Sequence, residues 1–170
     1  MVTLRPTRKL HTVLPITTDI SGTSDTALGD WYVNRIVVDR RPLLLLVSSA
    51  SLMPLLVPAR DVARLPDRIA DIVGARLRRL GIAMFIIEAE LRAMTPVAIG
   101  STVDRSVLGI MVDFAKSVPF HLEAGRWDDT SLELVEDRLA ETPCHAGRSS
   151  GQVVFPEKKT PELLRLKWPG

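Results

Sequence analysis

The sequence has 170 residues, of which 46% are apolar and 25% are charged, and its formal net charge at pH 7 is +2. This composition is typical of a single globular domain and excludes collagen-like, disordered and disulfide-rich chains. The single cysteine, Cys144, cannot form an intrachain disulfide, and the longest apolar run, residues 43–47, is too short to cross a bilayer. The sequence therefore predicts a cytoplasmic protein that makes no contact with a membrane.

The N-terminal part of the chain predicts a small β-sheet. Residues 2–5 have the length and composition of a short strand. Residues 31–39 and 42–48 predict a β-hairpin, because two apolar, β-branched runs flank a short polar turn. The uninterrupted apolar run of the second strand predicts an interior strand that is buried on both faces. Residues 52–57 predict a further strand, in which Pro54 indicates an edge position or a bulge.

Three main helices are predicted after this sheet. Residues 66–80 carry apolar side chains at spacings of three and four, with Pro66 suited to the first turn and Gly81 to the end of the helix. Residues 82–94 and 104–118 show the same helical periodicity of apolar side chains.

The predicted fold class is α+β, with a small, mostly antiparallel sheet packed against these three helices. Residues 97–99 predict the last strand of the sheet, and residues 131–139 predict a short acidic helix. The composition of residues 17–26 predicts a mobile loop. We expect one domain over residues 1–145 and a weakly ordered C-terminal tail over residues 146–170.

Residues 28–34 read LGDWYVN, and residues 105–114 read RSVLGIMVDF. These segments resemble the signatures LGDWYAN and RSVLGSMNDF of a bacterial domain family of unknown function, with Val33 in place of Ala, Ile110 in place of Ser and Val112 in place of Asn. The resemblance implies a shared fold and no particular activity, because the family has none established. Related domains are similar to part of plasmid and insertion-element passenger proteins, which implies a link to mobile elements or phage conflict.

The polar and aromatic residues of these segments are the candidate binding residues: Asp30, Trp31, Tyr32, Arg105 and Asp113. One hypothesis stacks Trp31 or Tyr32 on a ligand and places Arg105 on a phosphate or carboxylate. The other hypothesis is structural: Asp30 bonds backbone amides, Trp31 anchors the sheet, and Arg105 pairs with a carboxylate such as Asp30. Gly109, in the middle of a predicted helix, predicts the close approach of another backbone segment.

Basic residues near the N-terminus and in the first long helix are candidate phosphate contacts: Arg5, Arg8, Lys9, Arg64, Arg68 and Arg78. Asp67 and Asp71 lie among them and reduce the positive field, and no aromatic residues are interleaved for stacking on bases. The sequence therefore favours a protein partner and is compatible with weak binding of nucleic acid.

Familiar catalytic signatures are missing. The chain has no Gly-rich phosphate loop, no cysteine pair and only three scattered histidines, so it predicts neither a metal site nor a cofactor. Cys144 and His145 place a thiol beside an imidazole, but adjacent loop residues seldom point at one another.

Two functional hypotheses follow. The first is a non-enzymatic binding or interaction module for protein or nucleic acid. The alternative is a small enzyme or toxin-like nuclease that uses Asp30, Arg105 and Asp113. The sequence alone does not decide whether the protein is an enzyme. Burial of Asp30 and Arg105 against each other favours the first hypothesis, and an open cleft that joins them favours the second.

Overall fold

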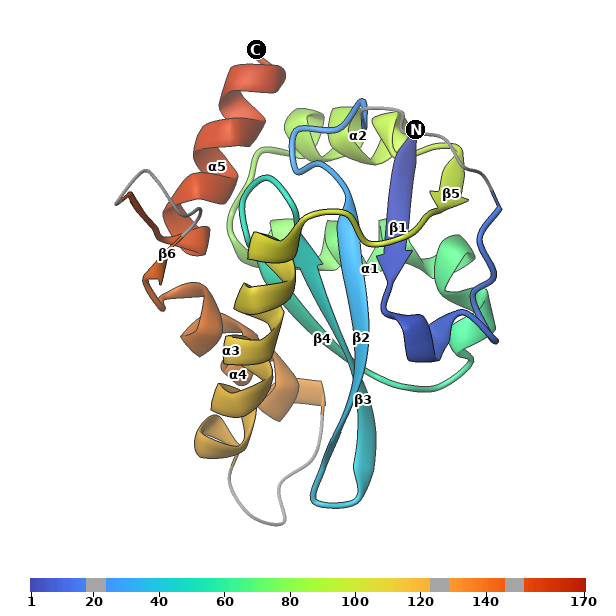
Figure 1. Cartoon of the computed structure of the whole chain (residues 1–170). Coiled ribbons are helices and arrows are strands. Elements are labelled where there is room, and N and C mark those ends of the chain that lie inside the picture. The colour runs from blue at the N-terminus through green and yellow to red at the C-terminus, as the bar shows by residue number, and fades with distance from the viewer. Residues whose placement is uncertain (18–23, 123–128, 146–151) are drawn as a thin grey trace.

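Five strands form one sheet in the order β4-β3-β2-β1-β5 (Figure 1). In the computed structural model, which describes residues 1–17, 24–122, 129–145 and 152–170, these strands are β1 (Val2–Pro6), β2 (Trp31–Val38), β3 (Arg41–Ser48), β4 (Pro54–Pro58) and β5 (Val97–Ile99). A smaller sheet pairs β6 (Cys144–His145) with β7 (Val153–Val154). The predicted mobile loop over residues 17–26 lies largely outside the described residues.

The helices are α1 (Leu65–Arg79), α2 (Met84–Ala93), α3 (Arg105–His121), α4 (Asp129–Ala140) and α5 (Pro156–Lys167), with short 3-10 turns at η1 (Arg8–Leu10) and η2 (Val62–Arg64). The fold is therefore α+β, as the sequence predicts. Within the described ranges, no helix combines the length and the apolar character that crossing a membrane requires.

The sheet is mixed, which corrects the predicted mostly antiparallel arrangement. β2, β3 and β4 are antiparallel neighbours, whereas β1 lies between β2 and β5 and runs parallel to both. Leu4 of β1 lies opposite Trp31 on one side and Ile99 on the other. Parallel neighbours need a long crossover, which the segment containing α1 and α2 supplies before β5. Turn signals reveal a hairpin between adjacent strands, but they carry no information about such distant pairings.

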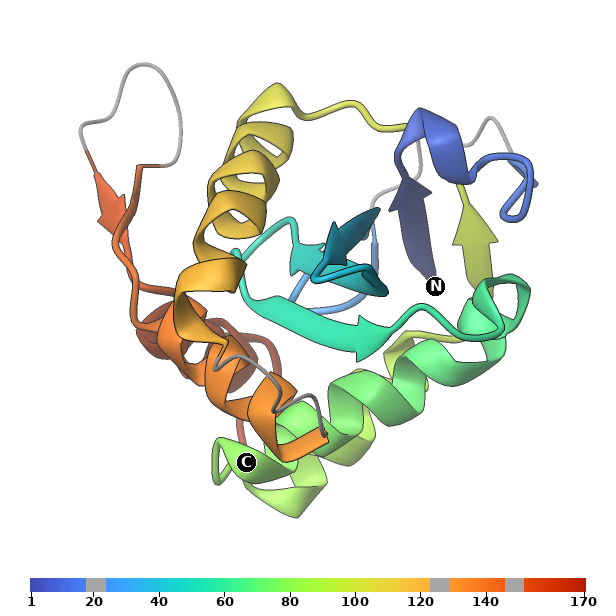
Figure 2. The same cartoon turned by 90° about the horizontal axis from the view of Figure 1, so that it is seen from below.

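β3 is buried on both faces, and its side chains alternate between two cores. Leu44 and Leu46 belong to a core formed with α1 and α2, whereas Leu43, Leu45 and Val47 belong to a second core formed with α3 and α4. Figure 2 shows the layers: α1 and α2 lie on one side of the sheet and α3 on the other, while α4 runs along the edge strand β4. The predictions of a doubly buried interior strand and of an edge position for β4 are both confirmed.

The C-terminal segment packs on the core, whereas the sequence predicts a weakly ordered tail over residues 146–170. Residues 156–167 form α5, which buries Thr160 and Leu164. Beyond the helix, Trp168 Nε1 donates a hydrogen bond of 2.7 Å to the buried carboxylate of Glu90 in α2. Two prolines and few apolar residues hide this helix from a periodicity analysis, because its attachment depends mainly on a few specific contacts.

Glu90 also holds the chain that enters β2. Its two carboxylate oxygens accept hydrogen bonds from the backbone N–H groups of Ala27 and Leu28, at 2.9 and 3.0 Å. The sequence predicts that Met84 of α2 faces inward, but Met84 is 53% exposed and Glu90 is 1% exposed. A buried carboxylate is stable here because backbone and indole N–H groups replace the water that it loses.

We predict that Leu45→Asp prevents folding, because Leu45 is completely buried in an interior strand and an unpaired charge there is too costly to retain. The matched control is Val37→Asp in β2, since Val37 is 57% exposed. Urea denaturation followed by circular dichroism should show a cooperative transition for the control and none for the Leu45 variant. A Leu45→Asp protein that unfolds at the wild-type midpoint would contradict the two-core description of β3.

Candidate functional site

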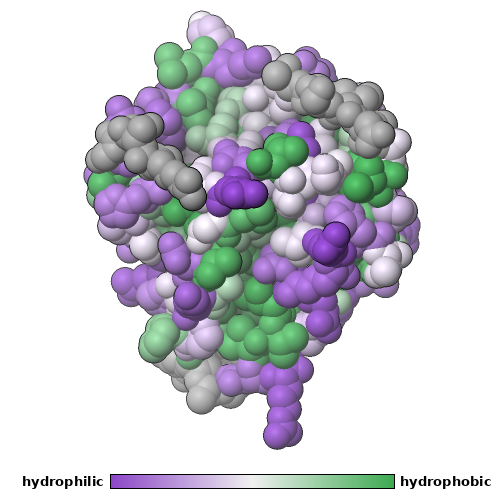
Figure 3. Space-filling model, in the orientation of Figure 1, coloured by the Kyte–Doolittle hydropathy of each residue, from purple (hydrophilic) through white to green (hydrophobic). Residues whose placement is uncertain are grey.

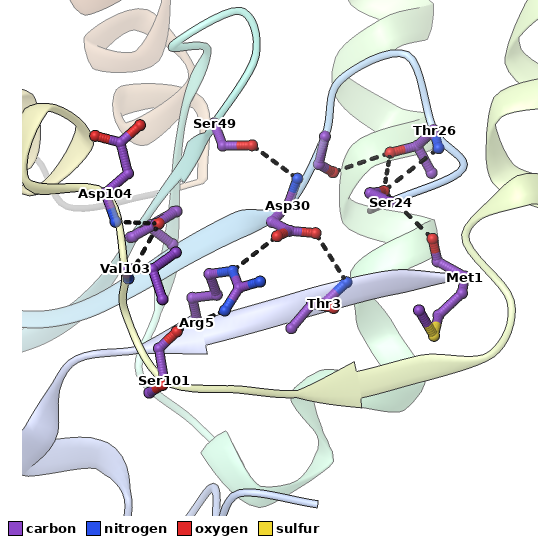
Figure 4. A network of polar contacts seen from close by, with 12 residues as sticks. Met1, Thr3, Arg5, Ser24, Thr26, Asp30, Ser49, Ser101, Val103 and Asp104 are labelled. Carbon is purple, nitrogen blue, oxygen red and sulfur yellow. Dashed lines mark hydrogen bonds and ion pairs between the residues drawn. The ribbon is translucent and has the colours of Figure 1, made fainter. Parts of the chain in front are cut away.

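An ion pair between Arg5 and Asp30 joins β1 to the start of β2 (Figure 4). Arg5 Nε donates to Asp30 Oδ2 at 2.7 Å, and Arg5 Nη1 donates to the carbonyl oxygen of Ser101 at 2.6 Å. Asp30 Oδ1 accepts a hydrogen bond of 3.3 Å from Thr3 N, and Asp30 N donates to Ser49 Oγ at 2.8 Å. The two charged side chains are only 8% and 14% exposed. Each charge is therefore compensated mainly by the other and by backbone groups.

The first signature segment is built into this network and into the cores. Gly29 has a φ of 71°, and a Cβ at this position would lie 2.4 Å from Ser49 Oγ, so only glycine fits. Trp31 and Tyr32 are each 1% exposed, and neither ring is free to stack on a ligand. Tyr32 instead uses its hydroxyl oxygen to accept a hydrogen bond of 2.9 Å from Asp104 N. The segment thereby ties β2 to the start of α3.

The second signature segment presents polar residues on the outer side of α3. Side chains at the spacing of helical turns share one side of this helix. We call this side the α3 stripe, and it consists of Arg105, Gly109, Val112, Asp113, Lys116 and Phe120. All six residues are exposed, Phe120 to 87% and Val112 to 50%. The face of the protein on which α3 lies shows apolar and hydrophilic surface interspersed (Figure 3).

The structure does not bring Asp30, Arg105 and Asp113 together. Asp30 pairs with Arg5, so the predicted pairing of Asp30 with Arg105 is wrong. Arg105 and Asp113 are eight residues apart on α3, or about 12 Å along the helix axis, which is too far for direct contact. Within the part of the chain that the structure describes, neither side chain has an ion-pair partner.

Gly109 lies in open space, which corrects the predicted close approach of another backbone segment. Among the described residues, and apart from the helix's own backbone, a Cβ at Gly109 would meet no atom within 4 Å. The inward side of α3 is instead formed by apolar residues such as Val107, Met111 and Phe114. A larger side chain at Gly109 therefore has room beside the described residues, and we expect no destabilisation by overpacking there.

A pocket of about 360 Å³ lies between β4, α1 and α4, and its polar lining includes Arg76, Arg79 and Glu136. Glu136 Oε1 accepts a hydrogen bond from Leu56 N of β4, and Glu136 Oε2 accepts one from Arg79 Nη1, both at 2.8 Å. Arg79 Nη2 donates to Asp137 Oδ1 at 2.7 Å, and Arg76 also pairs with Asp137. The volume suits a small ligand, but acids of α4 already neutralise these arginines.

Burial raises the pKa of Glu136, because removal from water disfavours the charged carboxylate, while the hydrogen bonds from Arg79 and Leu56 N oppose this effect. Glu136 also occupies the outward N–H of the edge strand β4, which blocks pairing with another strand at that position. The sequence predicts an acidic helix here but does not distinguish Glu136 from the exposed Glu133. The sequence does contain one signal for this contact: α1 carries arginines and α4 carries acids, so the charges of the two helices are opposite.

The thiol of Cys144 is buried beside α3. Cys144 Sγ donates to the carbonyl oxygen of Thr142 at 3.5 Å. Burial, and next the negative charge of Asp113, raise the pKa of Cys144 to about 11. Such a thiol stays protonated at neutral pH, and this disfavours a nucleophilic role.

The candidate phosphate contacts have different environments. Arg5 is buried in its ion pair with Asp30, so it is not available to a phosphate. Arg68 is half-buried, and its Nη1 donates to the carbonyl oxygen of Arg60 at 3.2 Å. The remaining four are exposed on η1, η2 and α1: Arg8, Lys9, Arg64 and Arg78.

The architecture is that of an α+β domain whose first signature segment forms a buried network and whose second forms an exposed helix face. The chain belongs to the family DUF6933, a domain of unknown function, which matches residues 3–159. No curated protein and no solved structure matches the chain. The similarity to passenger proteins of mobile elements therefore stays a prediction.

We predict that Asp30→Ala lowers the free energy of unfolding by about 3–5 kcal/mol, because it leaves the charge of Arg5 buried without its partner. Glu88→Ala on the exposed side of α2 is the control and should change the same quantity by less than about 0.5 kcal/mol. Chemical denaturation measures both values. Equal midpoints for the two variants would show that the ion pair does not stabilise the fold.

The raised pKa of Glu136 predicts a pH dependence of stability. The folded chain binds this proton more tightly than the unfolded chain does, so the stabilising contribution is complete below the ordinary glutamate pKa of about 4.3. It is lost as the pH rises through the raised value in the folded state. Glu136→Gln removes this titration while the amide oxygen still accepts from Leu56 N.

Urea denaturation across this acidic range should therefore show the wild type losing stability relative to the Glu136→Gln variant as the pH increases. The neighbouring Glu133 is 51% exposed, and Glu133→Gln should leave the pH profile unchanged. Parallel profiles for wild type and Glu136→Gln would mean that Arg79 and Leu56 N fully compensate the burial.

Proposed function

We propose that this chain is a non-enzymatic binding module that contacts a protein partner through the α3 stripe. The observation that supports the proposal is the environment of the second signature segment. Arg105, Gly109 and Asp113 are exposed on one side of α3. Among the described residues, neither charge has an ion-pair partner, and no atom beyond the helix's own backbone comes within 4 Å of a Cβ placed on Gly109. Exposed apolar side chains between and beside these charges, such as Val112 and Phe120, are characteristic of surfaces that bind proteins.

An enzyme built on Asp30, Arg105 and Asp113 has less support. The carboxylate of Asp30 is occupied by Arg5 and by Thr3 N, and none of the three candidate residues lines the pocket between β4, α1 and α4. Catalytic groups need a shared site within hydrogen-bond reach of the reacting atoms. The geometry therefore favours a binding module.

Nucleic acid is the less favoured partner. Arg5 is buried, and Arg76 and Arg79 are paired with acids, so the positive surface of the folded chain is smaller than the sequence indicates. The exposed arginines of η2 and α1 have Asp67 and Asp71 beside them. Binding to phosphates depends on unpaired positive charge and weakens with added salt.

Site-directed photo-cross-linking in cells tests this proposal. A benzophenone amino acid replaces Lys116 on α3 in one version of the full chain and the exposed Arg92 on α2 in the control version. We expect a covalent adduct with a protein from position 116 alone, and we expect Arg105→Asp to abolish it, because the contact depends on that charge. Adducts of equal yield from both positions, or none from either, would contradict the proposal.

The same purified chain is titrated with duplex and single-stranded DNA and RNA at low salt. We expect no mobility shift, because Arg5 is buried in its ion pair and because Asp67 and Asp71 lie beside the exposed arginines of η2 and α1. A shift that weakens with salt, and that disappears when Arg64 and Arg78 are both changed to Glu, would instead favour the nucleic-acid hypothesis.

A further inference from the structure

We propose that a second copy of this chain occupies the α3 stripe, with the two α3 helices antiparallel and a two-fold axis passing beside Gly109. This inference rests on the proposed function, since it names the partner for the same surface. Three features of α3 support this arrangement: the order of charges along the stripe, the open space at Gly109 and the exposed apolar side chains near the two ends of the helix.

The charges of the stripe are self-complementary about Gly109. Arg105 lies four residues before Gly109 and Asp113 lies four residues after it, all on the exposed side of α3. Each charge is therefore displaced by about 6 Å along the axis from the glycine, in opposite directions. When two such helices run antiparallel and cross at Gly109, Arg105 of each copy faces Asp113 of the other. Both charges, unpaired within the described part of the monomer, are satisfied together.

A second pair of opposite charges lies further from the crossing point. Lys116 is seven residues after Gly109, and the exposed Asp104 is five residues before it. Antiparallel docking brings Lys116 of one copy towards Asp104 of the other. A parallel arrangement would instead place Arg105 against Arg105 and Asp113 against Asp113, and such like-charge contacts are unfavourable. The charge order thus selects the antiparallel, two-fold arrangement, in which each contact occurs twice.

Gly109 provides the close approach that this arrangement needs. Glycine weakens a helix relative to alanine, and among the described residues no atom beyond the helix's own backbone lies within 4 Å of the position where a Cβ would be. The absence of a side chain therefore makes room for no other segment among the described residues. Between two helices that cross at this residue, it lets the backbones come close, and it leaves room over which Val112 of the other copy packs.

Exposed apolar side chains lie near both ends of α3. Phe120 is 87% exposed near the C-terminal end of α3, and Val103 is 69% exposed just before its N-terminal end. Antiparallel docking brings the Phe120 end of one helix to the Val103 end of the other. Phe120 lies about 16 Å along the axis from Gly109 and Val103 about 9 Å, so these two side chains approach one another without lying directly opposite. The arrangement is repeated on the opposite side of the axis.

Sedimentation equilibrium of the full chain at low salt, over a roughly hundredfold range of concentration, tests the inference. The wild type should show a monomer–dimer equilibrium. Arg105→Asp and Asp113→Arg should each raise the dissociation constant by at least about tenfold, because each places like charges together at both symmetric contacts. The double variant R105D/D113R recreates both pairs with reversed signs and should restore the wild-type constant to within about threefold.

Matched controls use the exposed charges of α2, which lie on a different helix. Glu88→Arg and Arg92→Asp change charges of the same kinds and should leave the dissociation constant unchanged. Gly109→Leu should prevent dimerisation by keeping the helices apart. Its melting temperature at low concentration should stay close to that of the wild type, since the added side chain has open space in the monomer.

A wild-type chain that is monomeric throughout would overturn the inference, and so would a double variant that fails to dimerise although it melts like the wild type. The two experiments distinguish failure of the dimer from failure of the proposed function. If the chain is monomeric but position 116 still gives a charge-dependent adduct with another protein, the stripe binds a different partner and only the dimer is wrong. An adduct with twice the mass of the chain supports both.

Discussion

The uninterrupted apolar character of β3 is the constraint on which the arrangement of the helices depends. Leu44 and Leu46 point to one face of the sheet and Leu43, Leu45 and Val47 to the other, so neither face of β3 tolerates water. Burial of apolar area stabilises the fold by about 25 cal/mol per Å². Helices must therefore cover both faces, and α3 binds the sheet with one side only. Because α3 covers the sheet with its apolar side, its outer side is exposed to solvent.

Three buried or nearly buried carboxylates connect the parts of this layered fold. Asp30, Glu90 and Glu136 each accept a hydrogen bond from a backbone N–H group far away in the sequence. The N–H of Thr3 lies in β1, that of Leu28 lies just before β2, and that of Leu56 lies on the edge strand β4. The carboxylates supply acceptors that regular strand pairing does not provide at these places. A buried donor without a partner is costly. The same carboxylates also bind Arg5, Trp168 and Arg79 respectively, and so attach further segments to the sheet.

The sequence predicts the elements whose signal is local and strong. The hairpin, the buried interior strand and α1 follow from apolar runs, turn residues and helical periodicity. The pairing of β1 with β5 and the choice of Arg5 rather than Arg105 as the partner of Asp30 do not follow, because they depend on which distant segments meet in space. The environment of Gly109 is also predicted wrongly, because the cost of a glycine in mid-helix indicates a close neighbour and the structure places none there among the described residues.

The two signature segments of the family differ in how far folding of the monomer explains their residues. Gly29 has a positive φ and no space for a side chain, and Trp31 is buried, so folding alone accounts for the first segment. Folding also accounts for the inward residues of the second segment, but not for Arg105, Gly109 and Asp113. An alanine at position 109 would fit the open space and would stabilise an isolated helix by about 1 kcal/mol. A residue that weakens its own helix, with no compensating contact among the described residues, is the observation behind the proposed contact with a second copy.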